Sequence, residues 1–336
     1  MNDNIITLDH GSGGKLSSQL IHSIFLKYFD NPILKKMHDG AILPKTNKRI
    51  AFSTDSFTVS PIFFPGGNIG DLAIHGTVND LAMCGAKPKY LSVSFILEEG
   101  IPIDSLEKIV RSMAKALKDI EIKIVTGDTK VVKHGEVDGI FINTTGLGYI
   151  EDSVYISAEQ AKEGDLILIN GPIGNHGISI LASRENLDLD KEIYSDTAPL
   201  ADMVEKMLEV SKDIHVLRDP TRGGLATALN EIAQSSNVQV EIDENKLPID
   251  NNVKDTCEIL GYDPLYLANE GKLIAFVPPK DAEKVLDKMK KCKYGEQSII
   301  IGKVVSTGKG TVYINTSIGG KRIVGMLSGQ QLPRIC

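Results

Sequence analysis

The sequence predicts an α+β protein of two domains, and three observations support this. The chain has 336 residues, which is too many for one ordinary core and suits two domains of roughly 100–200 residues each. Apolar residues make up 42% and charged residues 24% of the chain, a composition typical of folded globular proteins. Strand-like and helix-like runs follow one another in mixed order, which favours sheets backed by helices over a strict βαβ repeat.

The first half of the chain carries two well-marked helices. Residues 69–84 predict a helix with Asn68 as its N-cap. Residues 105–118 predict a second helix, capped by Asp104, with Glu107 completing a capping box. We expect strands in this half over residues 50–54, 122–125 and 139–143, the first ending at Asp55.

A polar stretch at residues 151–164 lacks any apolar period and marks the boundary between the domains. We therefore divide the chain into residues 1–155, residues 156–324 and a mobile tail, 325–336, which has no helical or strand period. In the second domain we expect helices near 174–184, 196–209, 223–235 and 280–291, and strands near 165–169, 238–242, 272–277, 298–305 and 311–315.

Charge and cysteine content exclude several classes of protein. A net charge of −7 argues against a nucleic-acid or anionic-membrane surface. The four cysteines are far apart and form no CxxC pair, so neither a zinc site nor a disulfide framework is predicted. No apolar run reaches the ~18–20 residues that span a bilayer, and the first residues lack the apolar core of a signal peptide. We expect a soluble cytosolic protein.

The common nucleotide and hydrolase motifs are absent. The chain has no GxxxxGK[ST] and no GxGxxG after a strand, and it lacks HExxH and GxSxG. A glycine loop does occur, Gly11-Ser12-Gly13-Gly14-Lys15. Its backbone N–H groups and one ammonium suit a phosphate. A flexible N-terminal segment would read the same way, and the residues alone leave both interpretations open.

Aspartates recur at what the sequence predicts to be turns and element ends: Asp39, Asp55, Asp80, Asp128 and Asp219. Any one of them alone is best explained as a cap or turn residue. Magnesium, however, prefers carboxylate oxygens and usually bridges to substrate phosphates. Five aspartates on glycine-punctuated turns therefore raise the expectation of a metal–phosphate site.

Two further features bear on chemistry. Glu270 lies in Asn269-Glu270-Gly271-Lys272 between two apolar runs, where a raised pKa could serve proton transfer; a plain polar turn between strands is the equal alternative. The last residue is Cys336. A thiol at the tip of a mobile arm suits the carriage of a covalent group between sites, although a chance terminal residue would look the same.

Together these segments resemble a known family. The runs STDSFTVSPIFFPGGNIGDLAIHGTVNDLAMCGAKP, TGDTKVV, RDPTRGGLATALNEIA and NEGK and the terminal PRIC resemble the HypE family of [NiFe]-hydrogenase maturation proteins over essentially the whole chain. The wider superfamily includes the ATP-using aminoimidazole ribonucleotide synthetase and selenophosphate synthetase. The resemblance implies a two-domain PurM-like fold whose N-terminal sheet forms a homodimer interface, with a flexible C-terminal tail.

The activity that the resemblance implies is carbamoyl dehydration. A partner transferase, HypF, would place a carbamoyl group on Cys336. ATP would then activate the carboxamide oxygen, phosphate would leave, and a protein thiocyanate would remain. The cyano group would pass to iron held by the HypC–HypD complex and supply the cyanide ligand of the hydrogenase.

The resemblance also implies ATP and Mg²⁺ as cofactors and a role for each matched residue. The expected metal ligands are Asp39, Asp80 and Asp219. The expected nucleotide contacts are Gly13, Gly14, Lys15, Asp55, Gly127, Asp128 and Thr129. The expected catalytic residues are Cys336 as the substrate carrier, Glu270 as the base, Asn269 and Lys272 in support of it, Lys15, and Arg222 as the phosphate grip.

Two alternatives stay open at this point. Selenophosphate synthetases share the aspartate turns but carry Cys or selenocysteine in the N-terminal glycine loop, where this sequence has Gly11-Ser12-Gly13-Gly14-Lys15. A non-enzymatic alternative is an ATP-gated scaffold with Cys336 as a docking or metal-delivery thiol. Aminoimidazole ribonucleotide synthetase would leave Cys336 unexplained.

Overall fold

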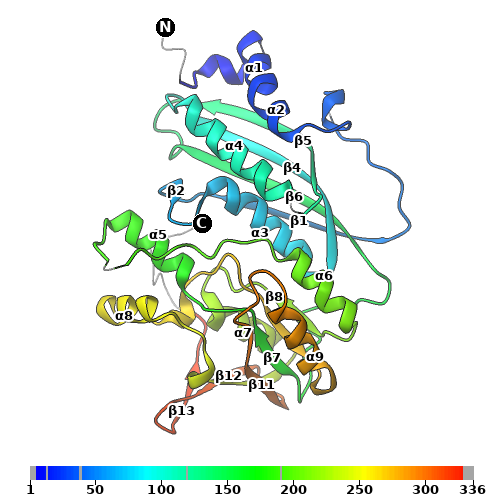
Figure 1. The fold of residues 1–336 in the computed structure, drawn as a ribbon, viewed down its shortest axis with the longest axis vertical. Coiled ribbons are helices and arrows are strands. Elements are labelled where there is room, and N and C mark those ends of the chain that lie inside the picture. Colours follow the sequence, from blue (N-terminus) through cyan, green and yellow to red (C-terminus); the bar gives the residue numbers. More distant parts are fainter. Residues whose placement is uncertain (1–4, 13, 38–39, 119, 190, 328–336) are drawn as a thin grey trace.

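The structure, a computed structural model, describes residues 5–12, 14–37, 40–118, 120–189 and 191–327. It has a four-stranded sheet formed by the first half of the chain and a seven-stranded sheet formed by the second half. The two lie one above the other along the long axis of the molecule (Figure 1). The predicted two-domain α+β fold is confirmed.

The N-terminal sheet has the strand order β1-β6-β4-β5. Its strands are β1 (Arg49–Phe57), β4 (Ala86–Glu98), β5 (Lys123–Val132) and β6 (Ile140–Ile150). Only β4 and β5 run parallel, and the crossover between them is α4 (Ile103–Lys118). Together with α3 (Ile69–Met83), α4 packs on one face of the sheet and forms one core with the inner side chains of the strands. Asn68 caps α3 as predicted, by accepting a hydrogen bond from the backbone N–H of Gly70.

The opposite face of this sheet exposes large apolar side chains. Phe52 is 72% exposed, Ile50 54% and Ile96 39%. These side chains occupy alternate positions on β1 and β4, as expected for residues that point to the same side of a strand. An exposed apolar sheet face of this kind is typical of a protein–protein interface.

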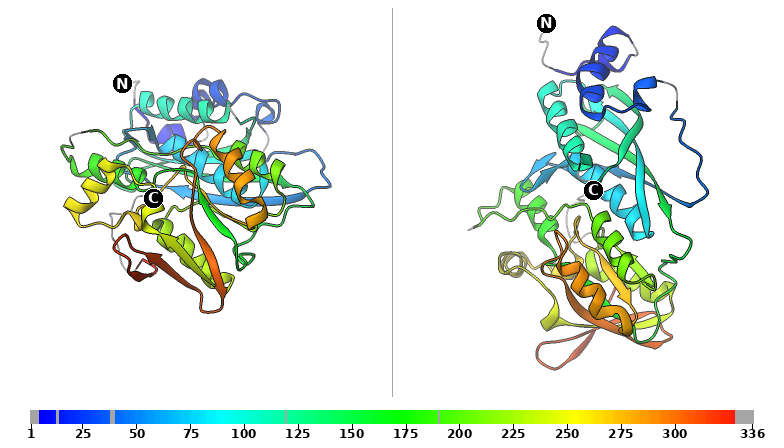
Figure 2. Two further views of the ribbon diagram at one scale, coloured as in Figure 1. Left: turned by 60° about the horizontal axis from the view of Figure 1, so that its bottom comes forward. Right: turned by 45° about the vertical axis from the view of Figure 1, so that its right-hand side comes forward.

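Short elements precede this sheet and flank its β5 edge (Figure 2). They are η1 (Leu8–Gly11), α1 (Lys15–Leu20), the single π-helical turn η2 (Ile21–Phe25), α2 (Leu26–Phe29) and η3 (Leu34–Lys36). A small hairpin of β2 (Phe63–Phe64) and β3 (Gly67–Asn68) leads into α3.

The second sheet has the order β13-β12-β9-β11-β7-β10-β8. Its strands are β7 (Leu166–Ile169), β8 (Val216–Arg218), β9 (Val238–Asp243), β10 (Ile274–Val277), β11 (Ile299–Thr307), β12 (Thr311–Asn315) and β13 (Lys321–Val324). The helices are α5 (Asn175–Glu185), α6 (Ala201–Val210), α7 (Gly224–Ser235), α8 (Asn251–Leu260) and α9 (Pro279–Lys290), with short turns η4 (Glu244–Lys246) and η5 (Pro264–Tyr266). Separate cores, one containing α7 and the other α6 and α9, bury the two faces of the central strands.

Several predicted strand ends were wrong. β1 continues through Asp55 to Phe57, and β5 and β6 extend to Val132 and Ile150. Asp55 and Asp128 therefore lie within strands and not at turns. The polar residues that looked like turn signals continue the extended backbone, with Asp55 paired to β6 and Asp128 paired to β4.

Two helix starts were also wrong. α4 begins at Ile103, so Asp104 lies in its first turn and not at its cap. The Glu107 carboxylate accepts hydrogen bonds from Lys27 and Tyr28, which takes it out of the predicted capping box. α6 begins at Ala201 and not near residue 196. The sequence reasoning also missed the long central strand β4, the strands β8 and β13, and the helix α8.

Two parts of the prediction stay untested. The proposed boundary between residues 155 and 156 falls between β6 and β7, whose ends are Ile150 and Leu166. Most of the predicted mobile tail, with Cys336, lies outside the described residues, as do Gly13 and Asp39. Among the described helices, none is both long and apolar enough to cross a bilayer.

Candidate active site

A cavity of about 490 Å³ lies where the two halves of the chain meet. It is bounded by β1 and α3 from the first half, and by α7, the loop after β8 and the turn before β10 from the second. Five of the predicted site residues line it: Asp55, Asp80, Asp219, Arg222 and Glu270. Residues far apart in the sequence are thus brought to one place, as the predicted site requires.

Two of these carboxylates, Asp80 and Asp219, are shielded from water, and the charge of one affects the pKa of the other. Asp80, in the last turn of α3, accepts a hydrogen bond from the Ser53 hydroxyl at 2.7 Å, and burial raises its pKa. Burial also raises the pKa of Asp219 to about 7, with the charge of Asp80 adding to the rise and Arg218 opposing it. Two desolvated carboxylates that line one cavity favour the binding of a cation there.

The donor set fits magnesium shared with a ligand. Within the described part of the chain, no three His, Cys, Asp or Glu side chains are grouped so that they could hold a metal ion on their own. Mg²⁺ is usually bound by one or two carboxylates, with water and substrate phosphates completing its shell. Asp80 and Asp219 supply such a pair, so the residues present fit a magnesium ion that arrives with a nucleotide.

Arg222 lies at the mouth of this cavity. Its Nη2 atom is 3.2 Å from Asp55 Oδ1, and its side chain is 71% exposed. The two glycines that follow it, Gly223 and Gly224, have φ values of 72° and 61°, a region that suits glycine. A Cβ on Gly224 would lie 2.5 Å from the carbonyl oxygen of Leu267. The DPTRGG sequence thus forms a sharp turn that presents Arg222 just before α7.

Glu270 also lines the cavity and is only 6% exposed. Its neighbours hold the surrounding loops. Asn269 Oδ1 accepts from the backbone N–H of Gly174 at 2.8 Å, and its Nδ2 donates to the carbonyl of Pro220 at 2.9 Å. This second bond fixes the loop that carries Asp219.

Lys272 forms a buried ion pair that the sequence reasoning missed. Its Nζ atom is 3.1 Å from Asp196 Oδ2, with the two side chains 10% and 6% exposed. Asp196 gave no signal in the sequence because it stands in a stretch that read as part of a helix. Asn269 and Lys272 therefore lie behind Glu270, in positions from which they can support it.

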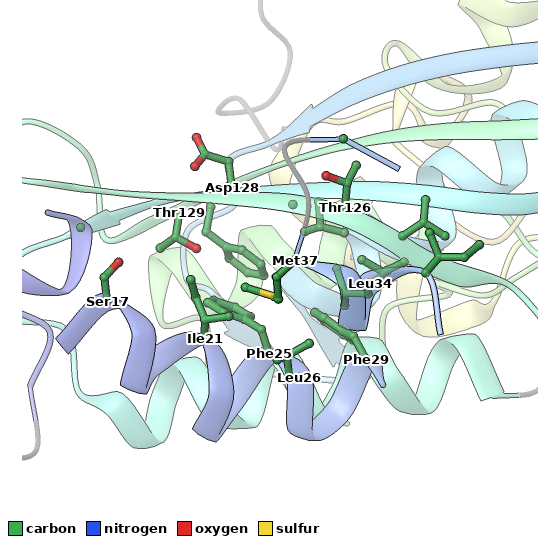
Figure 3. A pocket seen from close by; sticks show the side chains of 18 residues that line it. Ser17, Ile21, Phe25, Leu26, Phe29, Leu34, Met37, Thr126, Asp128 and Thr129 are labelled. Atoms are coloured by element: carbon green, nitrogen blue, oxygen red, sulfur yellow. The ribbon is translucent and has the colours of Figure 1, made fainter. Parts of the chain in front are cut away.

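Three of the other predicted nucleotide residues lie at a second cavity, of about 290 Å³, at the β5 edge. Gly127, Asp128 and Thr129 of β5 line it, opposite the apolar side chains of the N-terminal helices (Figure 3). Gly11 also lines it and lies against β5, because a Cβ there would be 2.7 Å from the backbone nitrogen of Val131. The glycine loop is therefore next to β5, with Gly14 as the N-cap of α1 and Lys15 as its first residue.

Within one chain, the residues of the first cavity and those of the second cavity stay apart. Asp55, Thr144, Val93 and Gly127 are successive partners in one row across the four strands. Adjacent strands lie about 4.8 Å apart, so Asp55 and Gly127 are separated by roughly 14 Å. They stand at opposite edges of the sheet, since β1 and β5 are its outer strands.

The comparisons with known proteins agree with this geometry. Residues 37–150 match the family described as AIR synthase related protein, N-terminal domain, and residues 162–315 match its C-terminal domain. A carbamoyl dehydratase HypE from Cupriavidus necator is 49% identical, with 98% of this chain and 95% of that protein aligned. The chain belongs to the HypE family. The HypE of Escherichia coli is 44% identical over 99% of this chain and 100% of its own length.

Solved HypE structures are equally similar. A crystal structure of HypE in complex with ATP has a TM-score of 0.94 and 52% identity, covering 98% of this chain and 99% of that one. A crystal structure of a HypE–HypF complex matches with a TM-score of 0.81 and 49% identity, covering 92% and 99% of the two chains. A thiamine-monophosphate kinase, 20% identical with a TM-score of 0.67 over 88% of this chain and 95% of its own, shares the fold alone. The sequence-based assignment to HypE and its PurM-like fold is confirmed.

Proposed function

We propose that this chain is an ATP-dependent carbamoyl dehydratase that converts a carbamoyl group on Cys336 into a thiocyanate. Its product supplies the cyanide ligand of the [NiFe]-hydrogenase iron centre. The observation that carries the proposal is the meeting of Asp80, Asp219 and Glu270 around one cavity. HypE relatives named as carbamoyl dehydratases, at 49% and 44% identity, support it over nearly the whole chain.

The chemistry requires a better leaving group than an amide oxygen. Transfer of the terminal phosphoryl group of ATP to the carboxamide oxygen creates one. The carbon–oxygen bond then breaks, two protons leave the nitrogen, and thiocyanate, ADP and phosphate remain. The carbon–sulfur bond to Cys336 stays intact throughout.

The residues of the cavity supply what phosphoryl transfer needs, which is chiefly positioning and charge neutralisation. Asp80 and Asp219 would hold Mg²⁺, which neutralises phosphate charge when it is bound. Arg222, exposed at the mouth, can hold the transferred phosphate in a two-pronged contact. Glu270, which lines the same cavity, would take the protons of the carboxamide nitrogen.

A homodimer would complete the nucleotide site. Asp128 and the glycine loop stand at the β5 edge, where Gly127 is roughly 14 Å from Asp55 at the β1 edge. The exposed apolar face that joins these edges suits pairing with a second copy about a two-fold axis. We place the β5 edge of one chain beside the β1 edge of its partner, so that ATP contacts both.

Two further parts of the proposal concern partners. The solved HypE–HypF complex supports HypF as the transferase that loads Cys336. The HypC–HypD complex, as carrier of the iron, would receive the cyano group. A cytoplasmic setting, where ATP is available, belongs to the same proposal.

Intact-mass measurement tests the reaction. Cys336 is first carbamoylated with HypF, and Mg-ATP is then added to the purified chain. The modified chain should lose the mass of one water, while a Cys336→Ala chain should never gain the carbamoyl mass. A chain that binds ATP yet keeps the full carbamoyl mass would instead support the scaffold alternative.

Mixing two inactive variants tests the shared site. If ATP lies between chains, a heterodimer of Asp80→Asn and Asp128→Asn has one site with both substitutions and one site with neither. Random reassembly should then restore about a quarter of wild-type activity. No recovery would show that each site is built from a single chain.

A further inference from the structure

A segment without regular secondary structure links the two halves of the active site. Residues 193–200, the strap, follow α5 and lead into α6. Figure 1 shows this part of the chain crossing the molecule between α3 and the second sheet. Although it forms no helix or strand, the strap is largely internal, with Ile193, Ala198 and Leu200 buried.

The strap is hydrogen-bonded to α3 next to Asp80, one of the two carboxylates proposed to hold Mg²⁺. Asn79, which is 1% exposed, donates to the carbonyl of Ala198 at 3.0 Å and accepts from the backbone N–H of Leu200 at 2.8 Å. His75, one helical turn before Asn79, is within 3.0 Å of the Thr197 hydroxyl through its Nδ1. Asp80 is the next residue of the same helix, so the strap is fixed directly beside it.

The strap is also tied to the turn that carries Glu270. Asp196 Oδ1 accepts a hydrogen bond from the backbone N–H of Glu270 at 3.1 Å, and Asp196 Oδ2 pairs with the Lys272 ammonium at 3.1 Å. Among the described residues Oδ2 has no hydrogen-bond partner of good geometry, so the Lys272 charge is what compensates this buried oxygen. One carboxylate thereby holds both sides of the turn.

The contact between strap and turn is too close for any side chain. A Cβ added to Gly271 would lie 1.8 Å from the carbonyl oxygen of Asp196. Asn79 Nδ2 is also 3.4 Å from the carbonyl oxygen of Glu270. The backbone of the turn, the strap and α3 therefore form one packed unit.

We propose that Asp196 is a positioning residue for the dehydration reaction. It sets Glu270 at a fixed separation from Asp80 on α3. Through the strap, the turn of the second half is held against the helix that carries Asp80. Asp196 itself does not touch substrate; it acts through Glu270 and Lys272. The inference rests on the proposed function, because it takes Glu270 as the base.

The isosteric variant Asp196→Asn tests this role. It keeps an oxygen for the Glu270 N–H but leaves the Lys272 ammonium uncompensated. We expect kcat for loss of water from the carbamoylated chain to fall about ten-fold or more, with KM for ATP within about two-fold of wild type. A fall in kcat without a matching rise in KM for ATP distinguishes a displaced Glu270 from a general loss of the ATP site.

Two further variants complete the experiment. The double variant Asp196→Asn/Lys272→Gln leaves no charge at this buried pair, so it should fold even if Asp196→Asn alone does not. Its kcat should stay at least about five-fold below wild type. Asp202→Asn, which removes one partner of the exposed Asp202–Lys206 pair on α6, is the matched control and should leave kcat unchanged.

The results separate this inference from the proposed function. A wild-type kcat in either Asp196 variant, or a KM for ATP that rises as much as kcat falls in Asp196→Asn, overturns the positioning role while wild-type dehydration still stands. Failure of the wild-type chain to lose water in the same assay contradicts the proposed function, and the positioning role falls with it.

Discussion

The Asp80 carboxylate, on α3 of the first half, raises the pKa of Asp219, which follows β8 of the second half. The two residues are 139 positions apart in the sequence, yet both line one cavity. Their proximity is unfavourable in the protein alone because like charges are desolvated together. A magnesium nucleotide would relieve this cost.

Neutralising either carboxylate should therefore remove ATP turnover. We expect Asp80→Asn and Asp219→Asn each to lower the rate of ATP hydrolysis at least about a hundred-fold, because phosphoryl transfer loses its metal ligand. Carbamoylation of Cys336 by HypF should continue, as followed by intact mass. The exposed Asp255 of α8 provides the control substitution Asp255→Asn. Loss of carbamoylation in the site variants would mean that these aspartates are structural.

Acid should unfold the chain through two buried histidines. Burial lowers the pKa of His75 to about 3 and that of His176 to about 4. An unfolded histidine has a pKa near 6.5, so the unfolded state takes up protons first as the pH falls. The contribution of the two histidines is complete above about pH 6.5 and falls below it by about 1.4 kcal/mol per pH unit for each histidine, down to the folded pKa. Asp219, whose pKa is raised to about 7, opposes one histidine over the same range, because its folded form binds a proton more tightly than the unfolded chain does.

Chemical denaturation between pH 6.5 and 4.5 measures this slope. His75→Gln and His176→Gln should each make it shallower, whereas His134→Gln, a change at a side chain that is 88% exposed, should leave it unaltered. An equal slope in all three variants and the wild type would show that other groups govern acid unfolding.

The open face of the N-terminal sheet should hold the homodimer together. Phe52 is 72% exposed there, and an aspartate in its place would put a charge into the centre of the apolar interface. Phe52→Asp should sediment as a monomer at concentrations where the wild type is dimeric. Ile318→Asp, at a residue that is 94% exposed and lies between β12 and β13, is the control. A dimeric Phe52→Asp variant would place the interface elsewhere.

Gly271 should be irreplaceable for packing reasons alone. Because its Cβ position lies 1.8 Å from the Asp196 carbonyl oxygen, Gly271→Ala forces the strap and the turn apart. We expect the free energy of unfolding to drop by about 3 kcal/mol. Gly325→Ala, where nothing lies within 4 Å of the added atom, should be neutral. Equal stabilities for the two variants would contradict the close packing of the strap.

The start of α3 was predicted correctly from a local sequence signal. Asn68 fixed the start of α3 because a cap acts through its own backbone neighbours. β1 and β5 were cut short because Asp55 and Asp128 looked like turn residues, although both lie within strands. Strand ends depend on what covers the sheet, which a single sequence does not show.

In the candidate site, residues within recognisable motifs were likewise predicted, whereas residues defined by long-range contacts were not. The family resemblance supplied Asp80, Asp219, Arg222 and Glu270, and the structure places them around one cavity. It could not supply Asp196, whose role depends on contacts with Glu270 and Lys272, 74 and 76 residues further along the chain. Nor could it indicate that Asp55 and Gly127 stand at opposite edges of one sheet.

The most direct test of the account follows the oxygen atom of the carbamoyl group. Cys336 is loaded with a carbamoyl group labelled with heavy oxygen, Mg-ATP is added in ordinary water, and the label is measured by mass spectrometry in phosphate and in water. Dehydration by phosphorylation of the carboxamide predicts that the heavy oxygen leaves in inorganic phosphate as the chain becomes a thiocyanate. Thiocyanate formation with unlabelled phosphate, or phosphate release from a chain that keeps its labelled oxygen, would contradict it.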